Sequence, residues 1–257
     1  MRSIATVGGA VLLVLSSGCT TPTPDPSTNL DAYLDTVIAA HGGDVLDRAT
    51  VTFTFRGDDF TLRRNEGQFR YERVTTDSTG RRMVEGLTNT DVYRVVEGDT
   101  TALSNEEQRT IATAVNSVAY FALLPYPLQD PPVQGTYAGA DTVAGTAYHR
   151  VAVSFSEGGG QDYQDEFLYW FDQATHALDY MAYAYGIGGP AEDQGTRLRE
   201  AFNVRTVNGV RIADYYNYRA AGIGPETLDA YPDSLAQDAV EQVSTVALED
   251  VRVTPLP

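Results

Sequence analysis

The sequence predicts a mainly β protein of the α+β class. We expect a single large curved antiparallel sheet, or unclosed β-barrel, of about 11–12 strands, with two main helices packed on its concave face. Apolar and polar residues alternate in many short runs that end in Gly, Asn or Asp. The connections between these runs are too short for parallel crossovers, which favours antiparallel pairing. Only two segments have the period of a helix.

The first predicted helix covers residues 30–41, where five apolar residues recur at helical spacing. These residues are Leu30, Tyr33, Leu34, Val37 and Ile38. Asn29 is a suitable N-cap, and two glycines after residue 41 end the helix. We interpret His41 as a structural residue, because a cationic side chain at the carboxyl end of a helix interacts favourably with the helix dipole.

A five-strand antiparallel meander is predicted after this helix. In its first strand, Val51, Phe53 and Phe55 alternate with threonines before a Gly-Asp turn. Apolar alternation continues at 60–62 and 69–71. Further strand-like runs lie at 81–88 and 91–97. Short runs separated by turn residues are typical of neighbouring antiparallel strands.

The second predicted helix covers residues 105–123. Ser104 and Glu107 have the spacing of a capping box, in which each side chain bonds the backbone of the other residue. Ile111, Val115 and Phe121 lie on the apolar stripe of this helix. Prolines between 125 and 132 then end it, because proline lacks the backbone N–H that a helix uses.

Strands resume after the prolines. They are predicted at 133–143, 146–156, 163–172, 177–186, 197–207 and 210–220. Asn208-Gly209 is the two-residue turn expected between the last pair. A polar loop is predicted over 222–237 and one long strand over 240–253. Because no internal repeat or linker divides the chain, we predict a single half-barrel domain over 29–257.

The central strands 167–171 and 180–185 are apolar or aromatic on both faces, so we expect both faces to be covered. A long twisted sheet curls, and a curled sheet under a helix leaves a concave apolar surface. Aromatic residues of the helix and strands are therefore candidates for the lining of a ligand cavity. These candidates are Phe53, Phe55, Phe121, Trp170, Tyr183 and Tyr185. The alternative is that these side chains fill the core themselves.

The first residues, 1–18, have the features of a secretory signal peptide: a basic start, a short apolar stretch and small residues before Cys19. The end of this segment resembles the lipobox of bacterial lipoproteins, although that motif usually has Leu where this chain has Ser16. The resemblance implies cleavage before Cys19 and a covalent diacylglycerol and acyl anchor on its sulfur and amino group. The alternative is an ordinary signal peptide followed by an incidental cysteine.

Residues 19–28 are rich in proline and threonine, and we predict a tether between the lipid anchor and the domain. In Gram-negative lipoproteins, which this segment resembles, the residue after the cysteine determines the membrane to which the protein is sorted. Thr20 rather than Asp after the cysteine implies an outer-membrane lipoprotein, which we expect to face the periplasm. The membrane is then a partner through the anchor, and the sequence predicts no particular protein partner.

The composition excludes several classes of function. The chain has 18 Lys and Arg residues against 35 Asp and Glu, and its formal net charge of −17 is unsuited to nucleic acid binding. It contains no Lys, so neither a Schiff-base lysine nor a P-loop lysine is possible. Nucleophile-elbow, zinc-binding and dinucleotide motifs are also absent from the sequence. We therefore predict no enzyme activity, no metal and no cofactor other than the acyl anchor.

One acidic cluster leaves a catalytic alternative open. Asp162, Asp165 and Glu166 follow three glycines, and paired carboxylates could serve a hydrolase as acid and base or could bind Ca²⁺. The competing interpretation is a solvated hairpin loop in an acidic chain. In a structural role, Asp165 would pair with Arg197 or Arg199 on a neighbouring strand.

The order of elements resembles a family of exported bacterial lipoproteins of unknown function over about residues 30–253. The resemblance lies in the helix end at 41–43, the second helix end at 124–126 and the segment 158–170. In layout the chain is also similar to the lipoprotein carriers LolA and LolB and to the mycobacterial lipoprotein LppX. That similarity implies an unclosed β-barrel with a helical lid over an apolar cavity that holds acyl chains.

These features together predict an outer-membrane lipoprotein that binds an apolar or acyl-chain ligand between its sheet and its helices without catalysis. The first alternative is a structural or interaction lipoprotein with a filled core, which would hold an envelope partner at a sheet edge or at the 222–237 loop. The second alternative is the hydrolase built on the acidic cluster.

Overall fold

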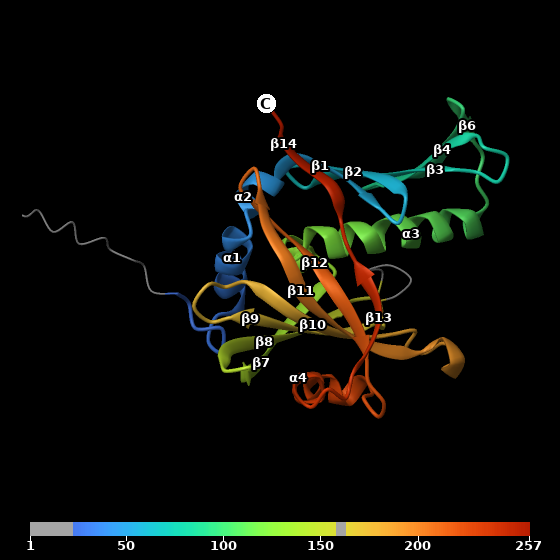
Figure 1. Ribbon diagram of the computed structural model, residues 1–257. Coiled ribbons are helices and arrows are strands. Elements are labelled where there is room, and N and C mark those ends of the chain that lie inside the picture. Colours follow the sequence, from blue (N-terminus) through green and yellow to red (C-terminus); the bar gives the residue numbers. More distant parts are fainter. Residues whose placement is uncertain (1–22, 158–162) are drawn as a thin grey trace, which may run out of the picture.

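The computed structural model describes residues 23–157 and 163–257. The predicted signal peptide over 1–18, the anchor Cys19 and the acidic residue Asp162 lie outside these described residues. The described chain forms two seven-stranded antiparallel sheets with a long helix between them (Figure 1). The predicted mainly β, α+β class and the open, unclosed arrangement of the strands are confirmed.

The first sheet has the strand order β14-β1-β2-β3-β4-β5-β6. Its strands are β1 Arg48–Phe55, β2 Asp58–Asn65, β3 Gln68–Thr76, β4 Arg82–Thr88, β5 Val92–Val96, β6 Asp99–Thr101 and β14 Glu249–Pro255. The predicted five-strand meander is confirmed as β1 to β5, each antiparallel to the next. Strand β6 was not predicted, because its three residues are polar and exposed and have no apolar alternation.

The second sheet has the strand order β13-β12-β11-β10-β9-β8-β7. Its strands are β7 Val133–Val143, β8 Thr146–Phe155, β9 Glu166–Asp172, β10 Leu178–Tyr185, β11 Gly195–Val207, β12 Val210–Arg219 and β13 Glu241–Val246. All six strands predicted between 133 and 220 are confirmed, with small differences at their ends. Asn208 and Gly209 form the predicted turn, and both have the positive φ that such a turn requires.

Two predictions are wrong in the segment 240–253. The strands form two sheets and not one continuous sheet, and this segment forms two strands and not one long strand. This segment forms β13 in the second sheet and β14 in the first, so it joins the two sheets (Figure 1). Between these strands, the Leu248 N–H donates a hydrogen bond to Asp214, and Arg205 donates one to the Leu248 carbonyl. The backbone N–H and carbonyl of Leu248 are thus bonded to side chains and not to a neighbouring strand. The strand ladder is interrupted at this residue, where the chain leaves one sheet and enters the other.

The two predicted helices are confirmed as α1 Leu30–Ala40 and α3 Asn105–Leu123. The Asn29 side chain accepts a hydrogen bond from the Ala32 N–H at the start of α1. Ser104 and Glu107 form the predicted capping box at the start of α3. A short helix, α2 Gly43–Leu46, follows α1, and short 3₁₀ segments η1 Tyr126–Gln129 and η2 Ala191–Asp193 occur in connections.

Both faces of the second sheet are covered, as predicted. Phe167, Tyr169 and Phe171 of β9 point to one side, which we call the inner face, where residues of α1 and α3 pack. Leu168 and Trp170 point to the other side, the outer face, because successive side chains of a strand alternate.

The outer face is covered by a segment that was predicted to be a polar loop, 222–237. This segment contains the 3₁₀ segment η3 Pro225–Ala230 and the helix α4 Tyr231–Ala236. Leu228 and Tyr231 are buried there, and the Tyr231 hydroxyl lies 2.8 Å from the Thr196 hydroxyl. Leu228, Tyr231 and Leu235 do recur at helical spacing, but the glycines and prolines between 222 and 232 favoured a loop.

Helix α3 lies between the two sheets (Figure 1). Its buried residues Ile111, Val115 and Ala119 belong to the core under the first sheet, with side chains of β1 to β4. Tyr120 and Phe121, on an adjacent side of the helix, pack against the inner face of the second sheet. The helix is therefore the element that connects the cores of the two sheets.

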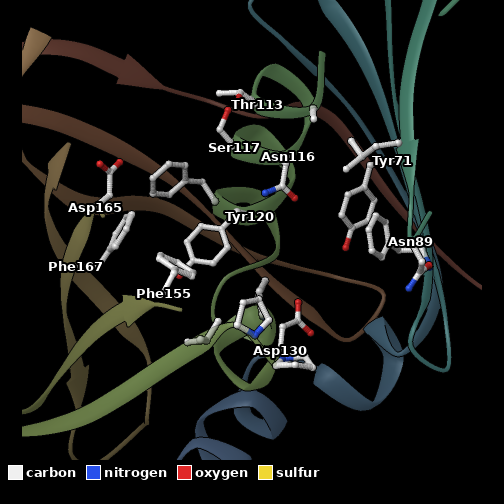
Figure 2. Close-up of a pocket in the computed structure, with 18 of the residues that line it drawn as sticks. Tyr71, Asn89, Thr113, Asn116, Ser117, Tyr120, Asp130, Phe155, Asp165 and Phe167 are labelled. Atoms are coloured by element: carbon white, nitrogen blue, oxygen red, sulfur yellow. The ribbon is translucent and has the colours of Figure 1, made fainter. Parts of the chain in front are cut away.

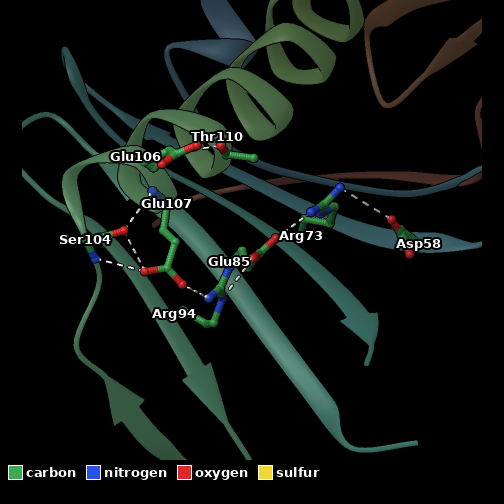
Figure 3. A network of polar contacts seen from close by, with 8 residues as sticks. All are labelled: Asp58, Arg73, Glu85, Arg94, Ser104, Glu106, Glu107 and Thr110. Atoms are coloured by element: carbon green, nitrogen blue, oxygen red, sulfur yellow. Dashed lines mark hydrogen bonds and ion pairs between the residues drawn. The ribbon is translucent and has the colours of Figure 1, made fainter. Parts of the chain in front are cut away.

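A buried carboxylate fixes the amino-terminal end of α3 to the first sheet (Figure 3). Glu85 of β4 is 2% exposed and forms ion pairs with Arg73 of β3 and Arg94 of β5. Arg94 also pairs with Glu107 of the capping box at 2.9 Å. One arginine thus joins the sheet carboxylate to the helix start.

His41 is a buried residue at the end of α1, but it does not have the cationic role predicted for it. Its Nδ1 lies 2.8 Å from the Val37 carbonyl of α1, and its Nε2 accepts a hydrogen bond from the Leu178 N–H of β10 at 3.1 Å. Burial lowers the pKa of His41 to about 4, partly offset by the bond to Val37. The neutral ring therefore connects α1 to the second sheet.

We predict that Glu85→Gln lowers the free energy of unfolding by about 3 kcal/mol, because it removes the buried anion of an ion-pair network and leaves Arg73 and Arg94 with only their more exposed partners, Asp58 and Glu107. Urea denaturation monitored by circular dichroism measures this loss. The control is Glu241→Gln in the exposed pair with Arg219, for which we expect a loss below about 1 kcal/mol. Equal losses in the two variants would contradict the prediction.

We predict that His41 makes the protein less stable as pH falls from about 6.5 to about 4. An unfolded histidine binds its proton near pH 6.5, whereas folded His41 does so only near 4, so the unfolded state binds more protons in this window. The contribution to stability is complete above the window and decreases by about 1.4 kcal/mol per pH unit within it. Denaturation of wild type and His41→Gln across this range tests the slope. A variant with the same slope would show that His41 does not cause it.

Candidate functional site

A cavity of about 880 Å³ lies beside α3, and we call it the main cavity (Figure 2). It lies between the first sheet, one side of α3, the proline-rich segment after α3, and the edge of the inner face of the second sheet. The residues that line it from the first sheet and its loops are Arg64, Gly67, Phe69, Tyr71, Leu87 and Asn89. Those from the segment after α3 are Pro127, Asp130, Pro131, Pro132 and Val133.

Helix α3 contributes Arg109 to the main cavity and, after it, a side of uncharged polar and aromatic residues. Figure 2 shows Thr113, Asn116, Ser117 and Tyr120 projecting from α3 toward this space. The helix has this orientation because Ile111 and the residues one and two turns later are buried under the first sheet. Residues one or two positions after these, such as Asn116 and Ser117, are rotated away from that core and lie toward the cavity.

An aromatic wall closes the cavity on the side of the second sheet. Phe155, Phe167 and Tyr183 lie in neighbouring strands, with the Phe155–Phe167 and Phe167–Tyr183 ring centroids each 5.7 Å apart. Tyr120 of α3 packs edge-on to Phe155 at 5.7 Å. The Tyr120 hydroxyl lies 2.8 Å from the Tyr169 hydroxyl, and burial raises the Tyr120 pKa. This wall therefore presents aromatic rings to the cavity, and the buried Tyr120 hydroxyl already has a hydrogen-bond partner in Tyr169.

The opposite end of the main cavity is polar, and its charged groups contact one another, although Nε of Arg64 is buried without a hydrogen-bond partner. Arg64 of β2 donates a hydrogen bond to the Tyr71 hydroxyl at 2.7 Å, and it lies 3.4 Å from the Asp130 carboxylate. Its guanidinium also lies over the Tyr126 ring, 4.4 Å from the centroid. Burial raises the pKa of Asp130, and Arg64 opposes that rise.

A second, smaller cavity of about 310 Å³ lies against another side of α3. It shares Ser117, Phe121 and Tyr183 with the main cavity, so these three residues form a common wall. Its other lining residues are Phe55, Arg56, Val118, Ala122, Arg199, Ala213, Tyr215, Asn217, Val246 and Leu248. The described residues beside α3 therefore enclose open space, which does not fit the alternative of an entirely filled core.

The six predicted cavity residues have different positions. Phe121 and Tyr183 line both cavities, and Phe55 lines the second cavity. Phe53 is buried in the core of the first sheet, stacked on Phe60 with ring centroids 5.3 Å apart. Tyr185 lies beside Arg197, whose guanidinium is 5.1 Å from its ring centroid, and lines neither of these cavities.

The structure corrects the prediction for Trp170. This side chain is fully buried on the outer face of the second sheet, and its Nε1 donates a hydrogen bond to Asp141 at 2.9 Å. It therefore points away from α3 and both cavities. The sequence could not distinguish the two faces, because strand β9 is apolar at every position from Phe167 to Phe171.

The acidic residues do not assemble as a hydrolase would require. Asp165 lines the main cavity, and its carboxylate accepts a hydrogen bond from the Gly186 N–H at 3.0 Å. Glu166 begins β9 on the face of Leu168, so it is directed to the other side of the sheet and is exposed. Asp162 lies outside the described residues. In the described part of the chain, no cluster of His, Cys, Asp and Glu could hold a metal ion.

The two arginines predicted to pair with Asp165 instead lie against aromatic rings. Arg197 donates a hydrogen bond to the Thr196 carbonyl at 2.7 Å and lies over Tyr185. Arg199 lies over the ring of Phe121, with its guanidinium carbon 3.8 Å from the centroid.

Sequence reasoning missed the polar residues of α3 as cavity residues. A signal for them exists, because α3 has no charged residue between Arg109 and its end at Leu123. A helix side that faces bulk water usually carries Lys, Glu or Arg, whereas Thr113, Asn116 and Ser117 are uncharged. Arg64 and Asp130 gave no comparable signal, because they meet only in the folded chain.

Comparison with solved structures found several proteins of similar layout. A LolA superfamily protein from Nitrosomonas europaea has a TM-score of 0.47 and 9% identity, with 87% of this chain and 94% of that chain covered. A domain named for outer membrane lipoprotein sorting, from Vibrio parahaemolyticus, has a TM-score of 0.45 and 9% identity, with 86% and 90% covered. Lipoprotein LppX from Mycobacterium tuberculosis has a TM-score of 0.26 and 14% identity, with 61% and 90% covered.

Comparison with curated protein sequences found no match. None of the helices in the described residues combines the length and apolar character needed to span a bilayer. A family model matches residues 31–247, which is most of the sequence and includes every lining residue of the two cavities except Leu248. The chain belongs to this family, which is the DUF6503 family of unknown function.

Proposed function

We propose that this protein binds an apolar or amphipathic molecule, such as one with an acyl chain, in the main cavity and does so without catalysis. The observation that carries the proposal is an open space of about 880 Å³ lined by Phe155, Phe167 and Tyr183 between two sheets and a helix. Typical small-molecule sites occupy roughly 300–1,000 Å³ and are mostly apolar with a few polar groups. The main cavity has both properties.

The affinity in this proposal comes from burial of hydrocarbon. Each CH₂ group removed from water contributes about 0.8 kcal/mol, and the aromatic wall offers rings with no unsatisfied polar group at Tyr120. Asn116, Ser117 and Thr113 provide a hydroxyl- and amide-bearing side on which a polar part of the ligand can rest. Release requires no chemical step, because no covalent bond forms.

We also propose that the protein is an exported lipoprotein of the outer membrane, anchored through Cys19 and facing the periplasm. The support is the sequence of residues 1–28, with its signal-like start, its lipobox-like end and its proline-rich tether. The described part of this segment, 23–28, forms a turn in which Pro26 is buried and the Asp25 carbonyl accepts hydrogen bonds from Thr28 and Asn29. A semi-extended tether is therefore proposed for residues 19–22 alone, roughly 12 Å at about 3.1 Å per residue. The cavity would then lie within reach of the lipid surface that supplies its ligand.

We predict that the neutral fluorescent probe N-phenyl-1-naphthylamine binds the wild-type protein saturably, because its apolar rings leave water for the main cavity. Thr113→Trp should weaken this binding by about tenfold or more, since the indole occupies cavity volume. Fluorescence titration measures both affinities.

The control for this test is Thr110→Trp, which places the same side chain on an exposed position of α3 outside the main cavity. We expect this variant to bind the probe as the wild type does. If the wild type shows no saturable binding, or if Thr113→Trp has no effect on it, the proposed ligand site is wrong.

We predict that the mature protein isolated from its native membranes begins at Cys19 and carries three acyl chains, because the lipobox-like end implies this modification. Intact-mass spectrometry measures the added mass. Cys19→Ala should shift the protein from the membrane fraction to the soluble fraction, since stable attachment needs at least two anchoring signals. An unmodified mass, or a variant that stays in the membrane fraction, would contradict the lipid anchor.

A further inference from the structure

The second cavity contains a cation that the described residues do not neutralise. Arg199 is in the middle of β11, next to Met181 of β10 and Asn217 of β12. Its side chain is 9% exposed, and its Nε and Nη1 are buried without a hydrogen-bond partner. A buried guanidinium normally has its donors paired, because removal of a charge from water is costly.

The contacts that Arg199 does make offset only part of this cost. The guanidinium carbon lies 3.8 Å from the Phe121 ring centroid and 5.4 Å from that of Tyr183. Cation–π contacts of this kind are favourable, by roughly 2 kcal/mol when desolvated, but they leave the N–H donors unused. Phe121 and Tyr183 also line both cavities, so the cation of the second cavity lies against the wall shared with the main cavity.

The charge around this position is opposite to that of the protein as a whole. The chain has a net charge of −17, yet the second cavity is lined by two arginines, Arg56 and Arg199, and by no Asp or Glu. The carboxylate of β12, Asp214, alternates with the lining residues Ala213 and Tyr215 and so points away from the cavity. Asp214 is instead paired with Arg205 at 3.1 Å.

A second polar group in the same cavity also lacks a partner. The Asn217 amide nitrogen donates a hydrogen bond to the Ser244 hydroxyl at 3.1 Å, whereas its Oδ1 is buried without one. Asn217 adjoins Arg199 across the β11–β12 ladder. The cavity therefore offers unpaired donors on Arg199 and an unpaired acceptor on Asn217, and its other lining residues are mostly apolar, with Arg56 and Ser117 as exceptions.

We propose that the second cavity binds the anionic head group of an amphipathic ligand, a carboxylate or a phosphate, through the guanidinium of Arg199. The inference rests on the proposed function and specifies its ligand. An anionic oxygen accepts hydrogen bonds from Arg199, and a hydroxyl of the same head group can donate to Asn217. The hydrocarbon part of the ligand lies against the apolar residues on either side of Phe121. Arg56, at the exposed end, adds a positive potential at the entrance.

The test compares ligands that share one tail and differ in the head. Palmitate, palmitoyl lysophosphatidate and hexadecanol each displace N-phenyl-1-naphthylamine from the wild-type protein, and their dissociation constants are measured. We expect at least one anionic ligand to bind about tenfold or more tightly than the neutral alcohol, a difference of about 1.4 kcal/mol. The anion that is preferred identifies the source, a free fatty acid or a phospholipid.

The variant Arg199→Met keeps the length and apolar stem of the side chain and removes the charge. We expect it to abolish the preference for the anion while the affinity for hexadecanol stays within about twofold. Arg199→Lys should retain part of the preference because the charge remains. The matched control is Arg197→Met, on the same strand but outside both cavities, which should retain it fully.

Thermal unfolding of Arg199→Met shows whether weaker anion binding results from the missing guanidinium or from destabilisation of the whole protein. Because the variant removes an unpaired buried charge, we expect its melting temperature to be equal to or above that of the wild type. If the wild type binds the probe but shows no preference for an anion, or if Arg199→Met keeps the preference, the inference is wrong and the proposed function stands. If neither the probe nor the three ligands bind, both are wrong.

Discussion

The position of α3 between two sheets is the constraint on which the rest of this structure depends. The helix buries Ile111 and Val115 under the first sheet and packs Phe121 against the second. A single helix about 10 Å wide cannot cover both sheets along their full width, so space remains on either side of it. The capping box and the Arg94 link to Glu85 hold its amino-terminal end in this position. The cavities are therefore a consequence of how few elements cover two large sheets.

Buried charged and polar groups of the scaffold differ from those of the candidate site in whether they have hydrogen-bond or ion-pair partners. Glu85 has two arginine partners, His41 uses both ring nitrogens, and Asp214 is bound by Arg205. Each of these groups stabilises a junction between elements. Arg199 differs, because its contacts are with aromatic rings and its buried donors are unused. Arg64, Arg73 and Arg150 each have a buried Nε without a partner but form ion pairs, whereas no described carboxylate pairs with Arg199. A cation left in this state retains binding energy for an anionic ligand.

Much of the fold could be predicted from local sequence patterns, and the site could be predicted only in part. Alternation and turn residues identified the strands, and caps such as Ser104 identified the ends of the helices, because these signals act within a few residues. The assignment of Trp170 to the wrong face and the missed break near Leu248 have a different cause. Both depend on partners distant in the sequence, Asp141 and Asp214 respectively. The lack of hydrogen-bond partners for Nε and Nη1 of Arg199 likewise depends on residues that meet only in the folded cavity.

Native mass spectrometry of the protein purified from its own cells in mild detergent is the most direct test of the central claim, that the space beside α3 holds a ligand. The account predicts a noncovalent adduct with the mass of an acyl-containing molecule, which is released on denaturation and extracted into organic solvent. A protein with the same mass in native and denaturing conditions, across several preparations, would contradict it.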